Sequence, residues 1–228
     1  MDIYSWIVQN KEIIKIFYAL VIILICSVIT LRSHKIFKLS EYQGIRYLRN
    51  AFFFYGIAFF IRYILGSKIF YLSQNNFDLI FVLFEFFFIM GGFFLLYSLL
   101  WKKLESVHKP SFSSVFSFRI FMFYLITAIF IVLDYVWQGF YFLFSSQILI
   151  FILAFAISFN NYHNRGRNRK FLKFYAFAML LALTAWIINA VAGILFHWSP
   201  IALISIYFLN IIMFLVFLIG VIKTTKLK

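Results

Sequence analysis

The sequence predicts an all-α membrane protein, with one bundle of seven transmembrane helices filling residues 1–228. Hydrophobic residues make up 65% of the chain and charged residues only 12%, whereas soluble domains average about 45–50% apolar residues. The apolar residues form seven segments, each close to the roughly 20 residues that a helix needs to cross a bilayer. The basic residues gather in alternate connections between these segments, which predicts an amino terminus outside and a carboxyl terminus in the cytoplasm.

The apolar segments follow one another from end to end and leave no room for a second domain. They lie at 13–31, 46–65, 77–100, 115–133, 139–159, 171–195 and 200–222. The first segment lacks a following small-residue cleavage site, so we expect a retained helix rather than a signal peptide. Asp134 and Gly139 lie in the short interruption between the fourth and fifth segments, which predicts a tight turn there.

Local patterns predict how two helices begin and how one packs. Ser40 followed by Gln43 has the spacing of a capping box and predicts a helix start near Glu41. Ser199 before Pro200 predicts the start of the last helix. The sixth segment repeats small residues at helical spacing, which predicts a face for close packing in lipid. This face holds Ala178, Ala182, Ala185, Asn189 and Ala192.

The distribution of Lys and Arg predicts the orientation. All but four of the 21 Lys and Arg residues follow the odd-numbered segments, and cytoplasmic loops carry such an excess. The four exceptions are Lys11, Lys15, Arg62 and Lys68. We therefore attribute the formal charge of +14 to topology in a plasma membrane rather than to nucleic-acid binding. The basic run at 165–170 is also suited to anionic lipid headgroups or to a separate protein partner.

Five polar side chains inside the apolar segments form the predicted site. They are Arg62, Glu85, Gln147, Asn189 and Asn210. A charge at membrane depth costs at least about 2.5–3.5 kcal/mol, so it normally faces the bundle interior with a partner. Arg62 is the expected partner of Glu85. Because most of the set falls in the outer halves of the spans, we expect an outward-opening polar pocket, although these groups could also serve only to join helices.

Several classes of chemistry lack their required residues. Retinal attachment needs a lysine midway along the last helix, and Lys223 lies past its end. His34, His108 and His163 fall one in each inner loop, at spacings that match no metal motif. The spans offer no histidine for haem or for activating a nucleophile. We expect no enzyme activity, no cofactor and no metal.

The leading hypothesis is a receptor-like or sensory protein that takes a small polar or ionic ligand from outside. With no output domain expected in the chain, its signal would pass through the basic cytoplasmic loops to a separate partner. One alternative is an ion or proton pathway that uses Glu85 and Arg62. Another is a membrane scaffold or assembly subunit in which the polar set only joins helices.

Overall fold

The computed structural model describes residues 9–67, 74–104, 118–137, 139–164, 170–194 and 200–226, and these are all-helical. Seven helices in this part are long and apolar enough to cross a membrane, which makes the chain a multi-pass membrane protein by length and composition. Their bounds are α2 Lys11–Ser40, α3 Gln43–Phe59 continued by η1 Phe60–Leu65, α4 Gln74–Leu104, α5 Phe118–Trp137, α6 Tyr141–Asn164, α7 Lys170–Ile194 and α8 Pro200–Lys226. Each of the seven predicted segments corresponds to one of these helices.

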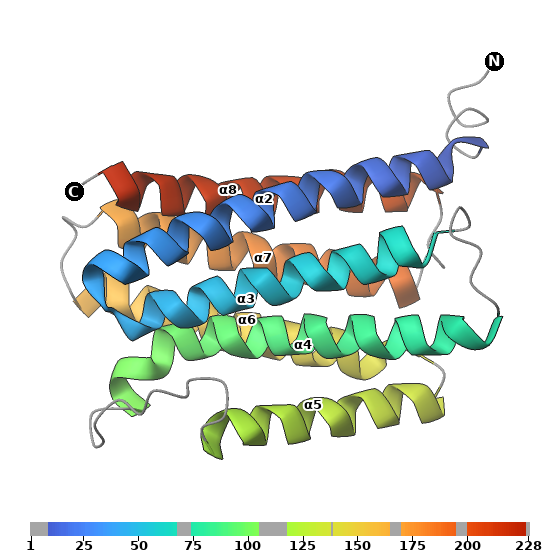
Figure 1. Cartoon of the computed structure of the whole chain (residues 1–228), viewed down its shortest axis with the longest axis horizontal. Coiled ribbons are helices and arrows are strands. Elements are labelled where there is room, and N and C mark those ends of the chain that lie inside the picture. Colours follow the sequence, from blue (N-terminus) through green and yellow to red (C-terminus); the bar gives the residue numbers. More distant parts are fainter. Residues whose placement is uncertain are drawn as a thin grey trace.

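The helices run back and forth along one common direction (Figure 1). α2 and α8 lie along one edge of the bundle and α5 along the other, with α3, α4, α6 and α7 between them. α2, α4, α6 and α8 begin at the same end, which we call the α2-start end. The opposite end, where these four helices finish, we call the basic end.

The α2–α3 connection differs from the predicted capping box. α2 continues to Ser40, whose hydroxyl donates to the Ile36 carbonyl oxygen at 2.8 Å instead of capping the next helix. Glu41 then adopts the left-handed conformation, with φ 50°, and reverses the chain. α3 begins at Gln43 without a side-chain cap, so the predicted start was close and the predicted cap was wrong. Ser40 favours its own helix because a serine hydroxyl can also bond to the carbonyl four residues earlier.

α4 is the most enclosed of the seven described spans, because 61% of the residues in its apolar stretch are buried. Its two adjacent glycines let both neighbours approach the backbone closely. A Cβ atom at Gly91 would lie 3.0 Å from the Tyr55 ring of α3, and one at Gly92 would lie 3.0 Å from Gln147 Oε1 of α6. Small residues allow such close helix contacts in lipid, where the hydrophobic effect adds little between helices.

The small-residue face of α7 lies inside the bundle as predicted. Ala178, Ala182, Ala185, Asn189 and Ala192 are all at most 8% exposed. α7 packs against α6 on one side and α8 on the other. This face therefore brings the amide of Asn189 to the bundle interior.

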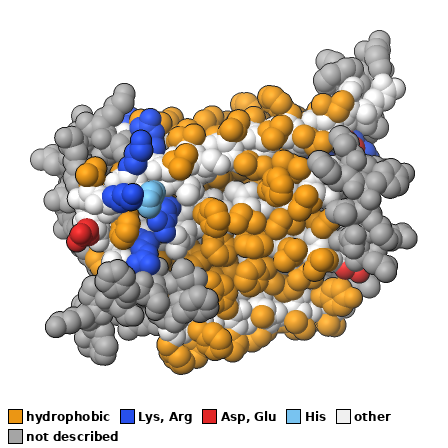
Figure 2. Space-filling view, viewed as in Figure 1, with side chains coloured by type: hydrophobic (Ala, Val, Ile, Leu, Met, Phe, Trp, Pro, Cys, Tyr) orange, Lys and Arg blue, Asp and Glu red, His pale blue; other side chains and the backbone are white. Residues whose placement is uncertain are grey.

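Most of the described basic side chains gather at the basic end, and a broad apolar band separates this group from the α2-start end (Figure 2). Within this group, His34 Nδ1 lies 3.0 Å from the Arg49 guanidinium. Lys223 lies 3.9 Å from the centre of the Phe174 ring, which joins α8 to α7 there. His108, Ser199, Lys68 and the side chains of the 165–170 run fall outside the described part.

Candidate functional site

The site begins with an irregular turn at the end of α3. Over Phe60–Leu65 the helix widens into the π-helix η1, and the Gly66 N–H donates to the Ile61 carbonyl oxygen five residues back at 3.0 Å. π-helical turns are rare and frequently occur at functional sites. Here the widened turn carries Arg62, the charged residue at the far end of this span from Arg46 and Arg49.

Aromatic rings surround the Arg62 guanidinium. Its central carbon lies 4.4 Å from the Phe84 ring centre, 5.0 Å from that of Phe140 and 5.6 Å from that of Tyr63. A cation–π contact contributes about 0.5–2 kcal/mol, more when it is shielded from water. Among the described residues, Arg62 makes no hydrogen bond and no ion pair within 4 Å. The rings therefore hold the cation in place while its N–H donors stay available.

Arg62 lines a cavity of about 350 Å³ near the α2-start end. Side chains from α2, α3, η1, α4, α6, α7 and α8 contribute to its wall. Asn189 and Asn210 line the same cavity, so the structure brings together three of the five predicted site residues. Ligand pockets commonly measure about 300–1,000 Å³, which places this cavity at the small end of the range.

The two amides are joined in a short hydrogen-bonded relay. Asn189 Nδ2 donates to the Ala185 carbonyl oxygen at 2.7 Å and to Asn210 Oδ1 at 3.5 Å. Asn210 Nδ2 in turn donates to the Tyr18 hydroxyl at 3.0 Å. The relay links α7, α8 and α2 across the bundle, and it fixes a polar side on the cavity wall.

Tyrosines form a second wall of the cavity, and the sequence analysis did not identify them. Tyr18 stacks on Tyr207 with ring centres 4.2 Å apart and an angle of 18°. Tyr63 meets Tyr18 edge-on at 5.5 Å. Aromatic residues make up 24% of the chain, so three tyrosines within the spans did not stand out in the sequence. A hydroxyl within an apolar span was the one available signal, since buried tyrosine hydroxyls usually need a partner.

Two charged residues near the start of α2 also line the cavity. Lys15 Nζ lies 3.0 Å from Glu12 Oε1, and both side chains are about one third exposed or less. The two charges neutralise each other at this position. Arg62 is therefore the one cation of the described wall that has no described anionic partner.

Glu85 lies apart from this cavity. It is 1% exposed and absent from the described lining, and no ion pair within 4 Å joins it to Arg62 among the described residues. Its carboxyl group instead interacts with that of Asp134 on α5, with the charge of Arg62 acting from farther away. The expected direct pair of Arg62 and Glu85 is therefore not what the structure shows. Rings occupy the near surroundings of the cation.

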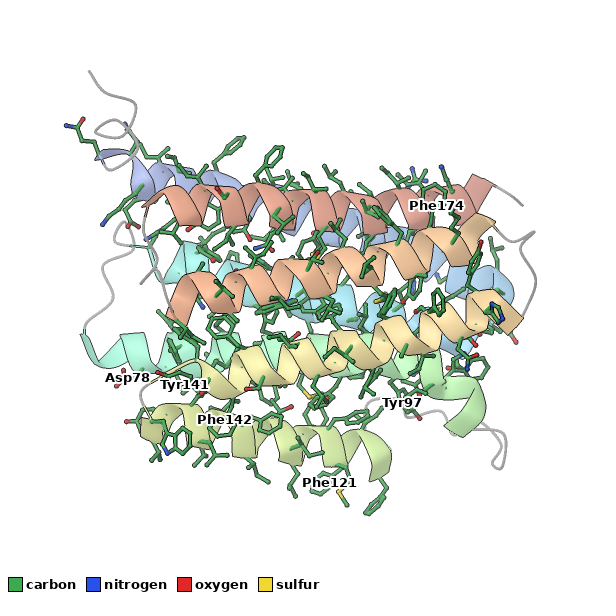
Figure 3. All side chains as sticks on the ribbon, turned by 180° about the vertical axis from the view of Figure 1, so that it is seen from behind. Asp78, Tyr97, Phe121, Tyr141, Phe142 and Phe174 are labelled. Atoms are coloured by element: carbon green, nitrogen blue, oxygen red, sulfur yellow. The ribbon has the colours of Figure 1, made fainter. Side chains whose placement is uncertain are left out.

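Asp134 links three helices. Its two carboxylate oxygens accept the backbone N–H groups of Phe142 at 2.9 Å and Leu143 at 2.7 Å, in the first turn of α6. The first N–H groups of a helix lack partners within that helix, so Asp134 caps α6 from α5. Figure 3 labels Phe142 and Tyr141 at this end of α6. The cap explains how the predicted tight turn holds.

Gln147 is fully buried on α6 and lies outside the described cavity wall. Its amide rests against the backbone of Gly92, and neither Oε1 nor Nε2 has a hydrogen-bond partner in the described structure. An unbonded buried amide costs about 1–3 kcal/mol. The predicted set thus divides into a cavity group, Arg62, Asn189 and Asn210, and a packing group, Glu85 and Gln147.

Comparisons with known proteins give little further guidance. No protein family model and no solved structure matches the chain. Over 47 residues it is 40% identical to an "Uncharacterized protein" of Archaeoglobus fulgidus. The aligned segment is 21% of this chain and 21% of that protein, so the chain spans about a fifth of the length of the relative that it matches.

Proposed function

We propose that this protein is a receptor-like plasma-membrane protein that binds a small polar or ionic ligand in the cavity around Arg62. The observation that carries the proposal is a guanidinium held by aromatic rings on the wall of a 350 Å³ cavity, without a described anionic partner. A charge at membrane depth normally has a partner, so the cavity beside the half-buried Arg62 favours a ligand group in that role.

The proposed ligand enters from outside. The cavity lies at the α2-start end, and most of the described basic side chains gather at the opposite end (Figure 2). The positive-inside rule then assigns the basic end to the cytoplasm and the cavity to the exterior. At the basic end, Arg46, Arg49 and Lys223 would face anionic headgroups or a cytoplasmic partner.

Binding would be sensed through helix packing. The cavity wall joins α2, η1, α7 and α8, and the relay of Asn189, Asn210 and Tyr18 links three of these helices directly. A ligand that binds Arg62 and this relay more tightly in one arrangement of the helices than in another stabilises the first arrangement. That change would be transmitted along the helices to the basic end and to a separate partner.

One observation favours the ion or proton pathway as a second candidate. Glu85 and Asp134 bring two carboxyl groups near each other inside the bundle, and Glu85 also interacts with the charge of Arg62. Intramembrane carboxyl groups commonly mark proton relays. A proton-flux assay in liposomes distinguishes the candidates, because only the pathway requires flux that is lost in Glu85→Gln.

A ligand screen on the intact protein tests the receptor proposal. The full chain in lipid nanodiscs is heated with each member of a panel of small anions, cations and neutral polar compounds. We expect at least one compound to raise the melting temperature of the protein, and we expect this rise to vanish in Arg62→Gln. Arg32→Gln, which removes a guanidinium near the other end of α2, should keep the rise. A panel without any Arg62-dependent ligand overturns the proposal.

A further inference from the structure

The geometry points to an organic monoanion as the ligand: one carboxylate on a compact aromatic or branched apolar body. This inference rests on the proposed function, since it names the ligand class of the same cavity. Its starting point is the composition of the cavity wall. One guanidinium without a described anionic partner, an amide and hydroxyl relay, and several aromatic rings line the cavity.

The charge of the described wall favours a single negative charge. Three charged side chains line the cavity, namely Glu12, Lys15 and Arg62. Lys15 and Glu12 pair with each other at 3.0 Å, which leaves the one positive charge of Arg62. A monoanion neutralises it, whereas a dianion would bring a second charge into a wall with no further unpaired cation. A cation would add a like charge beside Arg62 at high desolvation cost.

The surroundings of Arg62 favour a planar carboxylate. The Arg62 guanidinium lies over the Phe84 and Phe140 rings, and its N–H groups donate no hydrogen bond to the described residues. Guanidinium donors form a planar fork that matches a carboxylate in a two-bond arrangement. Because the Arg62 side chain is half-buried, an ion pair there is stronger than a fully exposed pair.

The rest of the cavity wall favours an apolar body. Trp186 lines it and meets Phe88 edge-on with ring centres 5.1 Å apart. Phe214 meets Phe59 edge-on at 5.7 Å, and both rings line the same space. An inorganic anion would bind Arg62 and leave these rings uncovered. An aromatic or branched acid covers them, and burying apolar surface contributes about 25 cal/mol per Å².

The polar relay adds a preference for a hydroxyl group on the apolar body. Tyr18 and Asn210 line the cavity and already bond to each other at 3.0 Å. A ligand hydroxyl can both donate and accept, so it can join this relay without leaving either side chain unpaired. A hydroxylated aromatic acid should therefore bind more tightly than its plain parent.

The test uses five probes that differ in charge, in a hydroxyl group or in the presence of an apolar body. They are phenylacetate, 4-hydroxyphenylacetate, the neutral isostere phenylacetamide, the cation phenethylamine and inorganic phosphate. Binding to the full chain in zwitterionic nanodiscs is followed by calorimetry and by tryptophan fluorescence, because Trp186 lines the cavity. Trp186→Phe identifies the part of the fluorescence signal that arises there.

We expect phenylacetate to bind at least tenfold more tightly than phenylacetamide, phosphate or phenethylamine. The hydroxylated acid should bind tightest, and Asn210→Leu should remove its advantage. Arg62→Gln should lower the affinity for phenylacetate at least tenfold. Arg62→Lys keeps the charge and should lower this affinity less, which would also confirm that the site tolerates substitution.

Other results overturn the inference in different ways. If phenylacetamide binds as tightly as phenylacetate, the negative charge is not recognised. If phosphate binds as tightly as phenylacetate, the apolar body is not recognised. Arg62-dependent binding of phenethylamine or of a neutral polar compound alone refutes the ligand class while the proposed function stands. If no compound binds here or in the wider panel, both fail.

Discussion

At the scale of single residues, Asp134 shows how one side chain can order a turn between two membrane spans. It is 1% exposed, and both of its oxygens accept backbone N–H groups of α6. N–H groups that are shielded from water need an acceptor within the protein, and the Asp134 carboxylate supplies it. The position of the α5–α6 turn therefore depends on this carboxylate more than on the turn residues themselves.

We predict that Asp134→Ala lowers the free energy of unfolding by about 2 kcal/mol, because it removes two hydrogen bonds to the start of α6. Asp134→Asn should lose less, since its amide oxygen can still accept one of them. Asp78→Ala serves as the control, because Asp78 is exposed at the start of α4. Chemical unfolding in mild detergent measures the difference. Equal effects at the two positions would show that the cap is unimportant.

Glu85 provides a second prediction at this scale. Gln has nearly the same size and carries N–H donors for the oxygens of Asp134, so Glu85→Gln should keep the melting temperature of the protein. Glu85→Ala leaves a gap in a site that is 1% exposed and should lower stability by about 2 kcal/mol. Thermal unfolding in nanodiscs compares the two. If Gln is as harmful as Ala, the ionisable group itself is needed, which favours the pathway candidate.

At the scale of elements, the sequence predicted the spans well and the site only in part. Length and hydropathy suffice for helices because each span must be apolar and satisfy its own backbone. η1 could not be predicted, since one widened turn leaves no compositional signal in the apolar run around Arg62. The contact of Glu85 with Asp134 depends on how α4 and α5 are rotated about their axes, which spacing along the chain does not determine.

α4 carries a prediction of its own, because Gly91 lies in close contact and Gly220 of α8 does not. A Cβ atom at Gly91 would lie 3.0 Å from the Tyr55 ring, whereas nothing lies within 4 Å of one at Gly220. Gly91→Ala should therefore destabilise the protein by about 1 kcal/mol through strain. Gly220→Ala should be neutral or stabilising by up to about 1 kcal/mol, because Ala is the better helix former.

Unfolding measurements on both glycine variants in the same detergent check this opposition of sign. A stabilising Gly91→Ala would mean that α3 and α4 can separate slightly without cost. The buried rings of Tyr55 and Phe88 have centres 4.9 Å apart, which indicates a close contact of α3 with α4. A stabilising Gly91→Ala would show that this contact is looser than that distance indicates.

At the scale of the whole molecule, the separation of charge from cavity is the feature on which a function depends. Basic side chains gather at one end (Figure 2), and the cavity around Arg62 lies toward the other. If the basic end faces the cytoplasm, as the positive-inside rule predicts, the cavity faces the exterior. A cavity that faced inward would instead be open to the cytoplasm, and Arg62 would then bind cytoplasmic anions.

Thiol labelling in intact cells tests this orientation. In a Cys26→Ala background, which removes the native thiol, we place a cysteine at Leu79 near the start of α4 or at Leu39 near the end of α2. Both side chains are exposed, at 58% and 77%, so reagent access depends on the side of the membrane. A membrane-impermeant reagent added outside should label Leu79→Cys at once and Leu39→Cys only after the cells are opened. The reverse pattern would turn the cavity toward the cytoplasm and remove the external ligand from the proposal, while leaving the geometry around Arg62 as a site for an internal one.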